Sequence, residues 1–284
     1  MNNSGIKYAL VSTVWYTLLV VGVKYIGTSL PTAQVVFARM AIALVLIFPL
    51  TSRKAKADLL ALRFIASHML RAVLGIAAIF CTFYGIARLP LSESTALSYS
   101  TPLMLVVLAR IILGEFVPAV RWLAVVCGAI GVVIISQPEG GTNFVPVMAI
   151  LVGCAAIAVN NLLVRSLSRK CSSEAIVLAF FSLGSLLAVP IAVTVWQTPT
   201  PSQAAALIFM GLAGGLFQCY QTKALQSISA SAIAPFLYCS IMWSIVCGWL
   251  LWSEIPKWTE VAGVMLILVN AMLGFCSVKV QEAK

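Results

Sequence analysis

Residue types that carry out enzyme chemistry are scarce and scattered in this chain. One histidine, His68, and eight Asp and Glu residues among 284 are too few for a Ser–His–Asp set or a multi-His metal site. The eight cysteines stand singly without a C-x-x-C pair, and glycine-rich phosphate-binding motifs are absent. We therefore expect no catalytic residues, no metal site, no cofactor and no ATP hydrolysis by this chain.

Two charged residues lie where a charge is costly. Arg39 is near the middle of an apolar run, where its charge would cost at least about 2.5 kcal/mol inside a membrane. It could anchor an anionic group of a substrate, form half of a gating pair, or make a structural contact between helices. Glu93 begins a later run, where it could carry a coupling proton, bind a cationic substrate, pair with Arg39, or be favoured by a helix dipole.

Two further carboxylates, Glu115 and Glu254, occupy matching positions. Each ends a long apolar run shortly before a proline. Matching positions indicate matching roles, so we expect each residue either to cap a neighbouring helix or to gate one face of the protein.

Aromatic and amide side chains inside the apolar runs are the remaining candidates for a binding site. Flat rings with polar edges suit an aromatic, heterocyclic or cationic solute, although aromatic residues also face lipid at membrane boundaries. Amides at depth hydrogen-bond either a substrate or a neighbouring helix. With Arg39, the candidate substrate-binding residues are Trp15, Tyr16, Phe83, Tyr84, Tyr99, Asn160, Gln218, Gln221, Tyr238 and Trp243.

The composition places these residues in a membrane protein. Hydrophobic residues make up 62% and charged residues 9% of the chain, with a mean hydropathy of +1.06, whereas soluble domains are about 25% charged. Because a spanning helix needs about 20 apolar residues, the sequence predicts an all-α integral membrane protein of ten transmembrane helices, with the lipid bilayer as its surroundings. These lie at about residues 6–23, 31–50, 68–88, 91–113, 119–136, 143–164, 174–196, 202–222, 228–252 and 258–278.

The distribution of basic residues predicts the orientation of the chain. With the N-terminus inside, 14 of the 18 Lys and Arg residues fall in inner segments and three fall in outer segments. Cytoplasmic loops carry such an excess, so the net charge of +10 does not indicate a nucleic-acid partner. We expect a multi-pass protein of the cytoplasmic (inner) membrane with both termini in the cytoplasm, which requires an even number of helices.

An internal repeat divides the chain into residues 1–139 and 140–284. Shifts of 139 or 141 residues align identical or similar residues in order along the chain. The aligned pairs are Lys24 with Arg165, Pro49 with Pro190, Gly75 with Gly214, Ser92 with Ser231, Tyr99 with Tyr238 and Glu115 with Glu254. Each half holds five predicted helices, an odd number, so the two five-helix repeats must be inverted in the membrane, as in many transporters.

Particular residues of both halves add a family resemblance. The first half carries His68-Met-Leu-Arg71, Phe83-Tyr84, Leu89 to Tyr99, Pro102 and Gly114-Glu115. The second half carries Ala230-Ser231, Ala234-Pro235-Phe236, Tyr238, Trp243, Gly248, Glu254-Ile255-Pro256 and Gly263. This pattern resembles the EamA-type carriers of the drug/metabolite transporter (DMT) superfamily, and is most similar to the subgroup with riboflavin and S-adenosylmethionine uptake carriers.

The resemblance implies a secondary transporter that works by alternating access around a central cavity. Its first, third, fourth, sixth, eighth and ninth helices would line that cavity. The implied substrate is a small organic metabolite, a vitamin- or nucleoside-like heterocycle such as riboflavin or S-adenosylmethionine. Export of amino acids or drugs is the alternative on the same fold, and an intramembrane enzyme or a channel fits the residues less well. Proton coupling, and a monomeric or homodimeric state, are left open.

Overall fold

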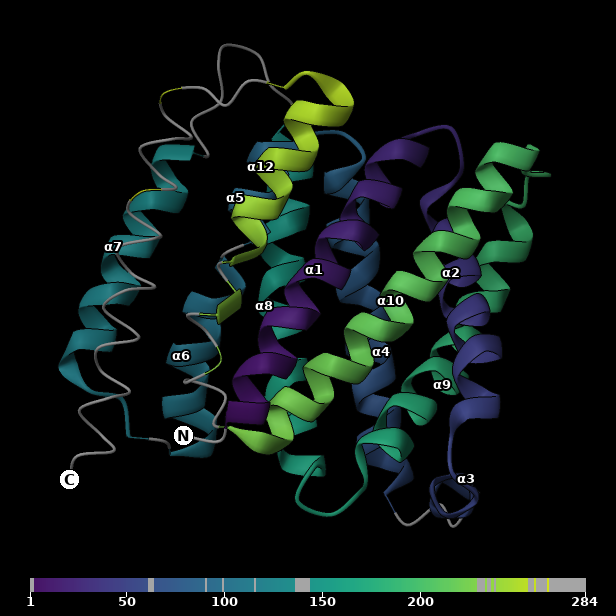
Figure 1. Ribbon diagram of the computed structural model, residues 1–284, viewed down its shortest axis with the longest axis horizontal. Coiled ribbons are helices and arrows are strands. Elements are labelled where there is room, and N and C mark those ends of the chain that lie inside the picture. Colours follow the sequence, from purple (N-terminus) through teal and green to yellow (C-terminus); the bar gives the residue numbers. More distant parts are fainter. Residues whose placement is uncertain are drawn as a thin grey trace.

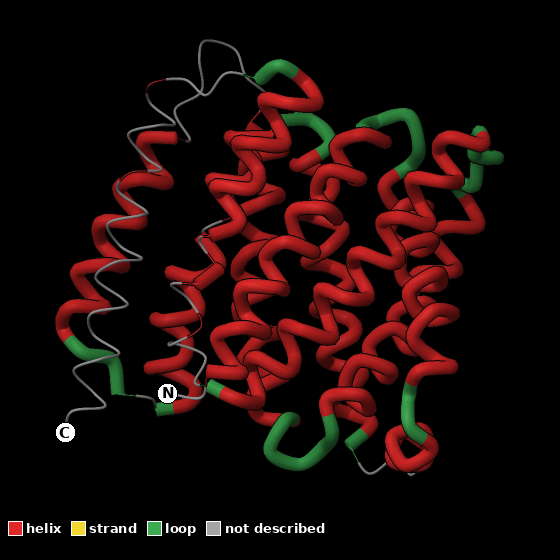
Figure 2. Tube along the Cα trace, viewed as in Figure 1, coloured by secondary structure: helices red, strands yellow, loops and turns green. Residues whose placement is uncertain are grey.

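A computed structural model gives the structure of most of the chain. It describes residues 3–60, 64–89, 91–98, 100–114, 116–135, 144–228, 233, 236–237, 239–254, 258 and 265. Within these ranges all regular structure is helical, and short turns connect several of the helices (Figure 2). The helices are α1 (Asn3–Ile26), α2 (Thr32–Ile47), the 3-10 turn η1 (Phe48–Leu50), α3 (Arg53–Leu60), α4 (Ile65–Ile86), α5 (Leu91–Ser98), α6 (Ser100–Leu113), α7 (Ala119–Ile135), α8 (Phe144–Leu167), α9 (Ser173–Thr194), α10 (Pro201–Ser227) and α12 (Cys239–Trp252).

Within the residues that the structure describes, six helical segments are long and apolar enough to cross a membrane: α1, α2 with η1, α4, α8, α9 and α10. Two shorter apolar helices are α6 and the Met242–Trp252 part of α12. The predicted all-helical membrane protein is thereby confirmed, whereas the count of ten helices and their inversion stay predictions. The predicted tenth run, 258–278, lies outside the described residues except at 258 and 265.

Helix starts follow from local sequence. Thr200 caps α10: its hydroxyl accepts from the backbone N–H of Gln203, while the Gln203 side chain accepts from the Thr200 N–H, and Pro201 occupies the first turn. Ser172 accepts from the N–H of Ala175 in the same way at the start of α9. Both arrangements satisfy backbone donors that a helix leaves free at its N-terminus, so these two starts are fixed by sequence alone.

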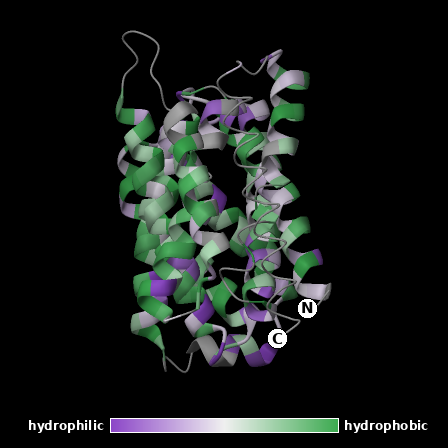
Figure 3. Ribbon diagram, turned by 90° about the vertical axis from the view of Figure 1, so that its left-hand side faces the viewer, coloured by the Kyte–Doolittle hydropathy of each residue, from purple (hydrophilic) through white to green (hydrophobic). Residues whose placement is uncertain are grey.

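The outer surface of the bundle is apolar. Hydrophobic residues colour most of the length of the helices (Figure 3), and many large ones are exposed, such as Leu186 and Val193 on α9, each 68% exposed, and Trp249 on α12, 60% exposed. A soluble protein rarely exposes such continuous apolar surface. This surface is the one expected to face lipid tails.

The principal helix contacts connect the two halves of the chain. α1 packs along α10, and α4 packs along α8 (Figure 1). α2 lies against α9 and α10, α9 also contacts α4, and α12 contacts α1 and α5. Suppose that α1, α2 and α4 of the first half correspond, in order, to α8, α9 and α10 of the second half. The contact of α1 with α10 then corresponds to the contact of α8 with α4. The main contacts therefore have the same pattern when viewed from either half.

Candidate functional site

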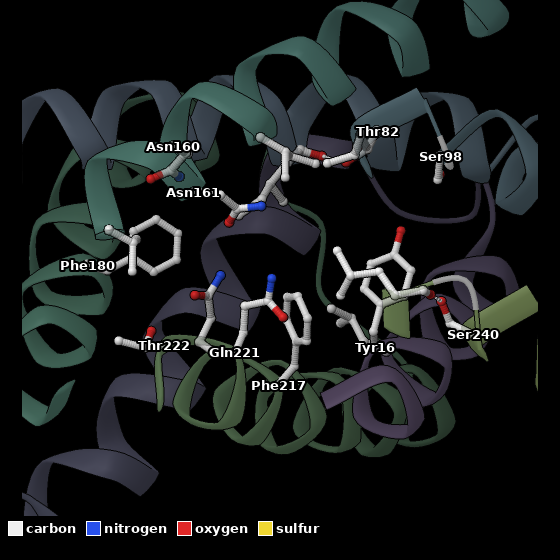
Figure 4. A pocket seen from close by; sticks show the side chains of 18 of the residues that line it. Tyr16, Thr82, Ser98, Asn160, Asn161, Phe180, Phe217, Gln221, Thr222 and Ser240 are labelled. Carbon is white, nitrogen blue, oxygen red and sulfur yellow. Dashed lines mark hydrogen bonds between the residues drawn. The ribbon is translucent and has the colours of Figure 1, made fainter. Parts of the chain in front are cut away.

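A cavity lies between α1, α2, α4, α8, α9 and α10, with further residues from α5, α6 and α12 in its wall (Figure 4). About 120 Å³ of it is open to the centre of a water-sized sphere, well above the roughly 10–15 Å³ that one water needs. Its aromatic groups, apart from Tyr16, are Phe83, Phe180 and Phe217. Its polar and charged groups are Thr13, Tyr16, Arg39, Arg71, Thr82, Ser98, Thr101, Asn160, Asn161, Gln218, Gln221, Thr222 and Ser240.

Arg71 on α4 is a buried cation held by neutral groups. It is 1% exposed, and its Nη1 donates to the backbone oxygen of Ile176 at 2.8 Å. Its Nη2 donates to Oε1 of Gln218 at 3.4 Å, and the guanidinium carbon lies 4.3 Å from the ring centre of Phe180. These contacts tie α4 to α9 and α10 and fix the direction of the side chain.

Arg39, half-way along α2, is equally buried but has fewer partners. It is 1% exposed, and its Nε and Nη1 have no hydrogen-bond partner among the described residues. The guanidinium carbon lies 5.5 Å from the ring centre of Phe83. Gly214 on α10 makes room for it, because a Cβ atom there would lie 2.6 Å from Nε of Arg39. Donors of a buried cation are thus left available beside the cavity.

Neutral polar groups face the same space. Asn160 and Asn161 from α8 point across the cavity toward Phe217 and Gln221 from α10 (Figure 4). Oδ1 of Asn160 and Oγ1 of Thr222 are buried and have no hydrogen-bond partner within the part of the chain that the structure describes. Buried polar atoms are normally paired, so these two are available to a bound molecule or to water.

An aromatic wall stands opposite these amides. The rings of Tyr16 on α1 and Phe217 on α10 lie with their centroids 5.3 Å apart and are tilted by 49°. The cavity thus combines aromatic rings with polar groups, the combination that small-molecule sites typically show.

A second polar cluster lies at the end of the bundle where α1 stops, which we call the Lys24 end. Nζ of Lys24 lies 3.3 Å from Oε1 of Glu254 and donates to the backbone oxygen of Leu89 at 2.7 Å. Oε2 of Glu254 accepts from the N–H of Leu91, the first residue of α5, at 3.0 Å. One carboxylate therefore joins the ends of α1 and α12 to the start of α5, as a capping group does.

The family of the chain is shown by comparison with known proteins. A model of the EamA-like transporter family matches residues 3–137 and again residues 145–275. The chain belongs to this family. It is therefore a multi-pass membrane transporter of the DMT superfamily and not an enzyme, as the sequence predicted.

Relatives of this EamA-like transporter differ in what they are named for. A pseudopaline exporter, CntI, of Pseudomonas aeruginosa is 29% identical over 94% of this chain and 94% of its own. An S-adenosylmethionine uptake transporter of Rickettsia bellii is 28% identical over 93% of this chain and 90% of its own. A solved crystal structure has a TM-score of 0.72 over 96% of this chain and 98% of its own at 15% identity, which shows the fold alone.

Six of the predicted binding residues of this EamA-like transporter line the cavity together. They come from five helices: Tyr16, Arg39, Phe83, Asn160, Gln218 and Gln221. Ser12 donates to Oε1 of Gln221 at 3.2 Å, so this amide also joins α1 to α10. Their role as substrate ligands stays a prediction.

Three predicted residues lie away from the cavity wall. Trp15 packs against the apolar core, Tyr84 lies 3.7 Å beneath the guanidinium of Arg88, and Trp243 is 47% exposed. Successive helix residues point about 100° apart, so Tyr16 and Phe83 face the cavity while their neighbours Trp15 and Tyr84 turn away.

The remaining predicted residues are carboxylates and tyrosines with other placements. Glu254 is at the Lys24 end, and Glu93 is half-buried in the first turn of α5. Arg39 contacts the ring of Phe83, and its pairing with Glu93 stays a prediction. Three residues lie outside those that the structure describes: Tyr99, Glu115 and Tyr238.

Sequence reasoning missed Arg71 and most of the cavity's hydroxyl groups. Arg71 was counted with the charges of inner segments, yet it is buried inside α4. The signal that could have found it is its spacing: Arg71, Gly75, Ile79 and Phe83 recur every four residues and all line the cavity. Hydroxyls such as Ser98 and Thr222 give no such signal, because Ser and Thr are common in spanning helices.

Proposed function

We propose that this EamA-like transporter is a secondary transporter that moves a small organic metabolite across the cytoplasmic membrane by alternating access. The observation that carries the proposal is the cavity, which helices from both halves enclose in the middle of an apolar bundle. A polar solute that leaves water to cross a membrane loses its contacts with water. A pocket of rings and hydrogen-bonding groups replaces those contacts.

The proposal includes ten helices in two inverted five-helix repeats, residues 1–139 and 140–284. Two observations support it: the family model matches each half separately, and the helix contacts keep the same pattern when the halves are exchanged. Repeats of this kind rock against each other and expose a site at their interface to each side in turn. Arg39 on α2 and Gly214 on α10 lie at that interface.

For the substrate we propose a vitamin- or nucleoside-like heterocycle, with riboflavin and S-adenosylmethionine as first candidates. Tyr16 and Phe217 offer rings for stacking, and Asn160 and Gln221 offer amides for the polar edge of the heterocycle. The relatives named as S-adenosylmethionine uptake transporters support this choice. The relative named as an exporter supports the alternative, export of amino acids or drugs.

Glu93 is our candidate for carrying a coupling proton, because it is a half-buried carboxylate on α5, a helix with a residue in the cavity wall. We also propose that both termini lie in the cytoplasm, which the excess of basic residues in alternate loops supports.

The test is solute flux in proteoliposomes that contain the full chain. Labelled S-adenosylmethionine, riboflavin and amino acids are supplied with and without a proton gradient. We expect saturable flux of one compound, reduced at least about tenfold in Gln221→Leu, which removes a hydrogen-bonding group from the cavity. The control Trp243→Ala, away from the cavity, should keep the flux. Flux that does not saturate, or equal loss in both variants, would contradict the proposal.

A further inference from the structure

We propose that the cavity binds its solute through a carboxylate group held at Arg39, in a positive field that Arg71 supplies. This inference rests on the proposed transport function. It narrows the substrate from small organic metabolites in general to those that carry a carboxylate, zwitterions included.

The first observation is the charge balance of the cavity. Arg39 and Arg71 both line it and are each 1% exposed, and among the described residues that line it none is Asp or Glu. A cation in a spanning helix costs at least about 2.5 kcal/mol and is normally neutralised by a partner. An anionic solute supplies that partner, whereas a neutral or purely cationic solute leaves both charges in place.

Arg71 is the fixed member of the pair. The backbone oxygen of Ile176, the amide oxygen of Gln218 and the ring of Phe180 hold its guanidinium. All three groups are neutral, so they set its direction without cancelling its charge. Arg71 is therefore a positioning residue that makes the cavity attractive to an anion.

Arg39 is the member with more unpaired donors, because at Arg71 only Nε lacks a partner among the described residues. Its Nε and Nη1 lack hydrogen-bond partners within the described residues, and the ring centre of Phe83 lies 5.5 Å from its guanidinium carbon. A hydrogen bond between a guanidinium and a carboxylate is among the strongest such a donor can make. The solute's carboxylate is the group that best completes this side chain.

The two arginines act on the same stretch of the cavity. Nε of Arg39 lies beside Gly214 of α10, while Arg71 hydrogen-bonds Gln218 of the same helix. Gly214 and Gln218 are four residues apart, about one helical turn, which rises about 5.4 Å. Both arginines therefore contact the face of α10 that borders the cavity.

Other groups of the cavity suit the rest of such a solute. Oδ1 of Asn160 and Oγ1 of Thr222, both without partners in the described part of the chain, can accept hydrogen bonds from an amino group. The rings of Tyr16 and Phe217 can contact a flat ring. Of the first candidates, S-adenosylmethionine has a carboxylate for Arg39 and riboflavin has none, but the sulfonium and ammonium groups of S-adenosylmethionine meet two arginines and no acidic residue among the described lining residues.

The test compares matched ligands that differ by one carboxylate. The full chain in lipid nanodiscs is titrated with S-adenosylmethionine and its decarboxylated form, and with phenylalanine and phenethylamine, while thermal unfolding is followed. Ligand binding raises the apparent stability in proportion to RT ln(1 + [L]/Kd). We expect the carboxylated member of at least one pair to bind about tenfold tighter or more. Arg39→Gln should abolish this preference, and Arg88→Gln, at an exposed arginine, should keep it.

Several outcomes would overturn the inference. Equal shifts from both members of each pair would do so, as would a carboxylate preference that persists in Arg39→Gln. Inorganic phosphate and chloride are also titrated, and an Arg39-dependent shift from either with none from a carboxylate would exclude the proposed class. If Arg39→Gln does not fold, Arg39→Lys replaces it: the charge remains, so the preference must survive with weaker affinity.

Flux measurements separate this inference from the proposed function. Riboflavin flux that is equal in wild type and Arg39→Gln would overturn the carboxylate site and leave transport standing. Arg39-dependent carboxylate binding without flux of any carboxylated compound would keep the site and overturn transport.

Discussion

The Lys24 end and the central cavity both hold cations that are largely removed from water, and the two regions compensate them differently. At the Lys24 end the ammonium group has an acidic partner, Glu254 at 3.3 Å, as well as the backbone oxygen of Leu89. In the cavity Arg39 and Arg71 meet rings, an amide and a backbone oxygen, and no acidic residue among the described ones lines the wall.

This difference separates a structural charge from a binding charge. An ion pair with both partners supplied by the chain holds helix ends together whatever the cavity contains. A carboxylate supplied by the protein inside the cavity would compete with that of a solute and weaken binding. Arg39 has no ionic partner within the described part of the chain, which costs stability in the empty protein, and sites that bind ligands commonly carry such a cost.

Arg39→Met should give the largest contrast between the two regions. Arg39 has no acidic partner among the described residues, so its removal should raise the free energy of unfolding of the ligand-free protein, on the order of the 1–4 kcal/mol found when buried ion pairs become apolar. Carboxylate flux should fall about tenfold to 100-fold, because a charged hydrogen bond is lost. Lys24→Met should instead lower stability. Thermal unfolding in nanodiscs measures the stability of the two variants, and flux in proteoliposomes measures their transport. Destabilisation by Arg39→Met would contradict the distinction between the cavity and the Lys24 end.

Gly214→Ala should have an intermediate effect, confined to the cavity. The new Cβ would lie 2.6 Å from Nε of Arg39, so the guanidinium must move and flux should fall about tenfold. Gly184→Ala on α9 is the matched control, because its Cβ would meet the flexible Sδ of Met40 at 3.3 Å. Initial flux rates of the two variants test this, and equal rates would show that the position of Arg39 is unimportant.

The smallest effect is expected from the ion pair itself. A double-mutant cycle of Lys24→Met and Glu254→Gln should give a coupling energy of about 0.5–1 kcal/mol, because both side chains are partly exposed. Ligand affinity should not change. A protein in which the two residues are exchanged, Lys24→Glu with Glu254→Lys, should recover little of the stability lost by the single variants. The reason is that Lys24 also donates to the backbone oxygen of Leu89 and Glu254 also accepts from the N–H of Leu91. Full recovery in the exchanged protein would reduce the cluster to a simple charge pair.

The sequence predicted the class of the fold and part of the cavity. Composition and run length were sufficient for an all-helical membrane protein, because a spanning helix must be apolar over its whole length. Arg39 was found because a charge within an apolar run is conspicuous, and Gln218 and Gln221 because amides three apart share a helix face. All three line the cavity.

What the sequence could not supply is the rotation of each helix and the pairing of distant segments. Trp15 and Tyr16 are equally good candidates until the face of α1 that meets α10 is known. Arg71 looked like a charge at the membrane surface because it lies near one end of its run. The contact between Lys24 and Glu254 joins residues that only the packing of α12 against α1 and α5 brings together.

The separation of Lys24 and Glu254 along the chain has a consequence for biosynthesis. They are 230 residues apart, so at about 5–20 residues per second Lys24 leaves the ribosome roughly 10–50 s before its partner. During that interval its ammonium group must stay hydrated at the membrane surface, which its long aliphatic stem allows. α1 is likewise synthesised before α10, the helix against which it packs. The packing of α1 is thus completed only by segments that are made much later than α1 itself.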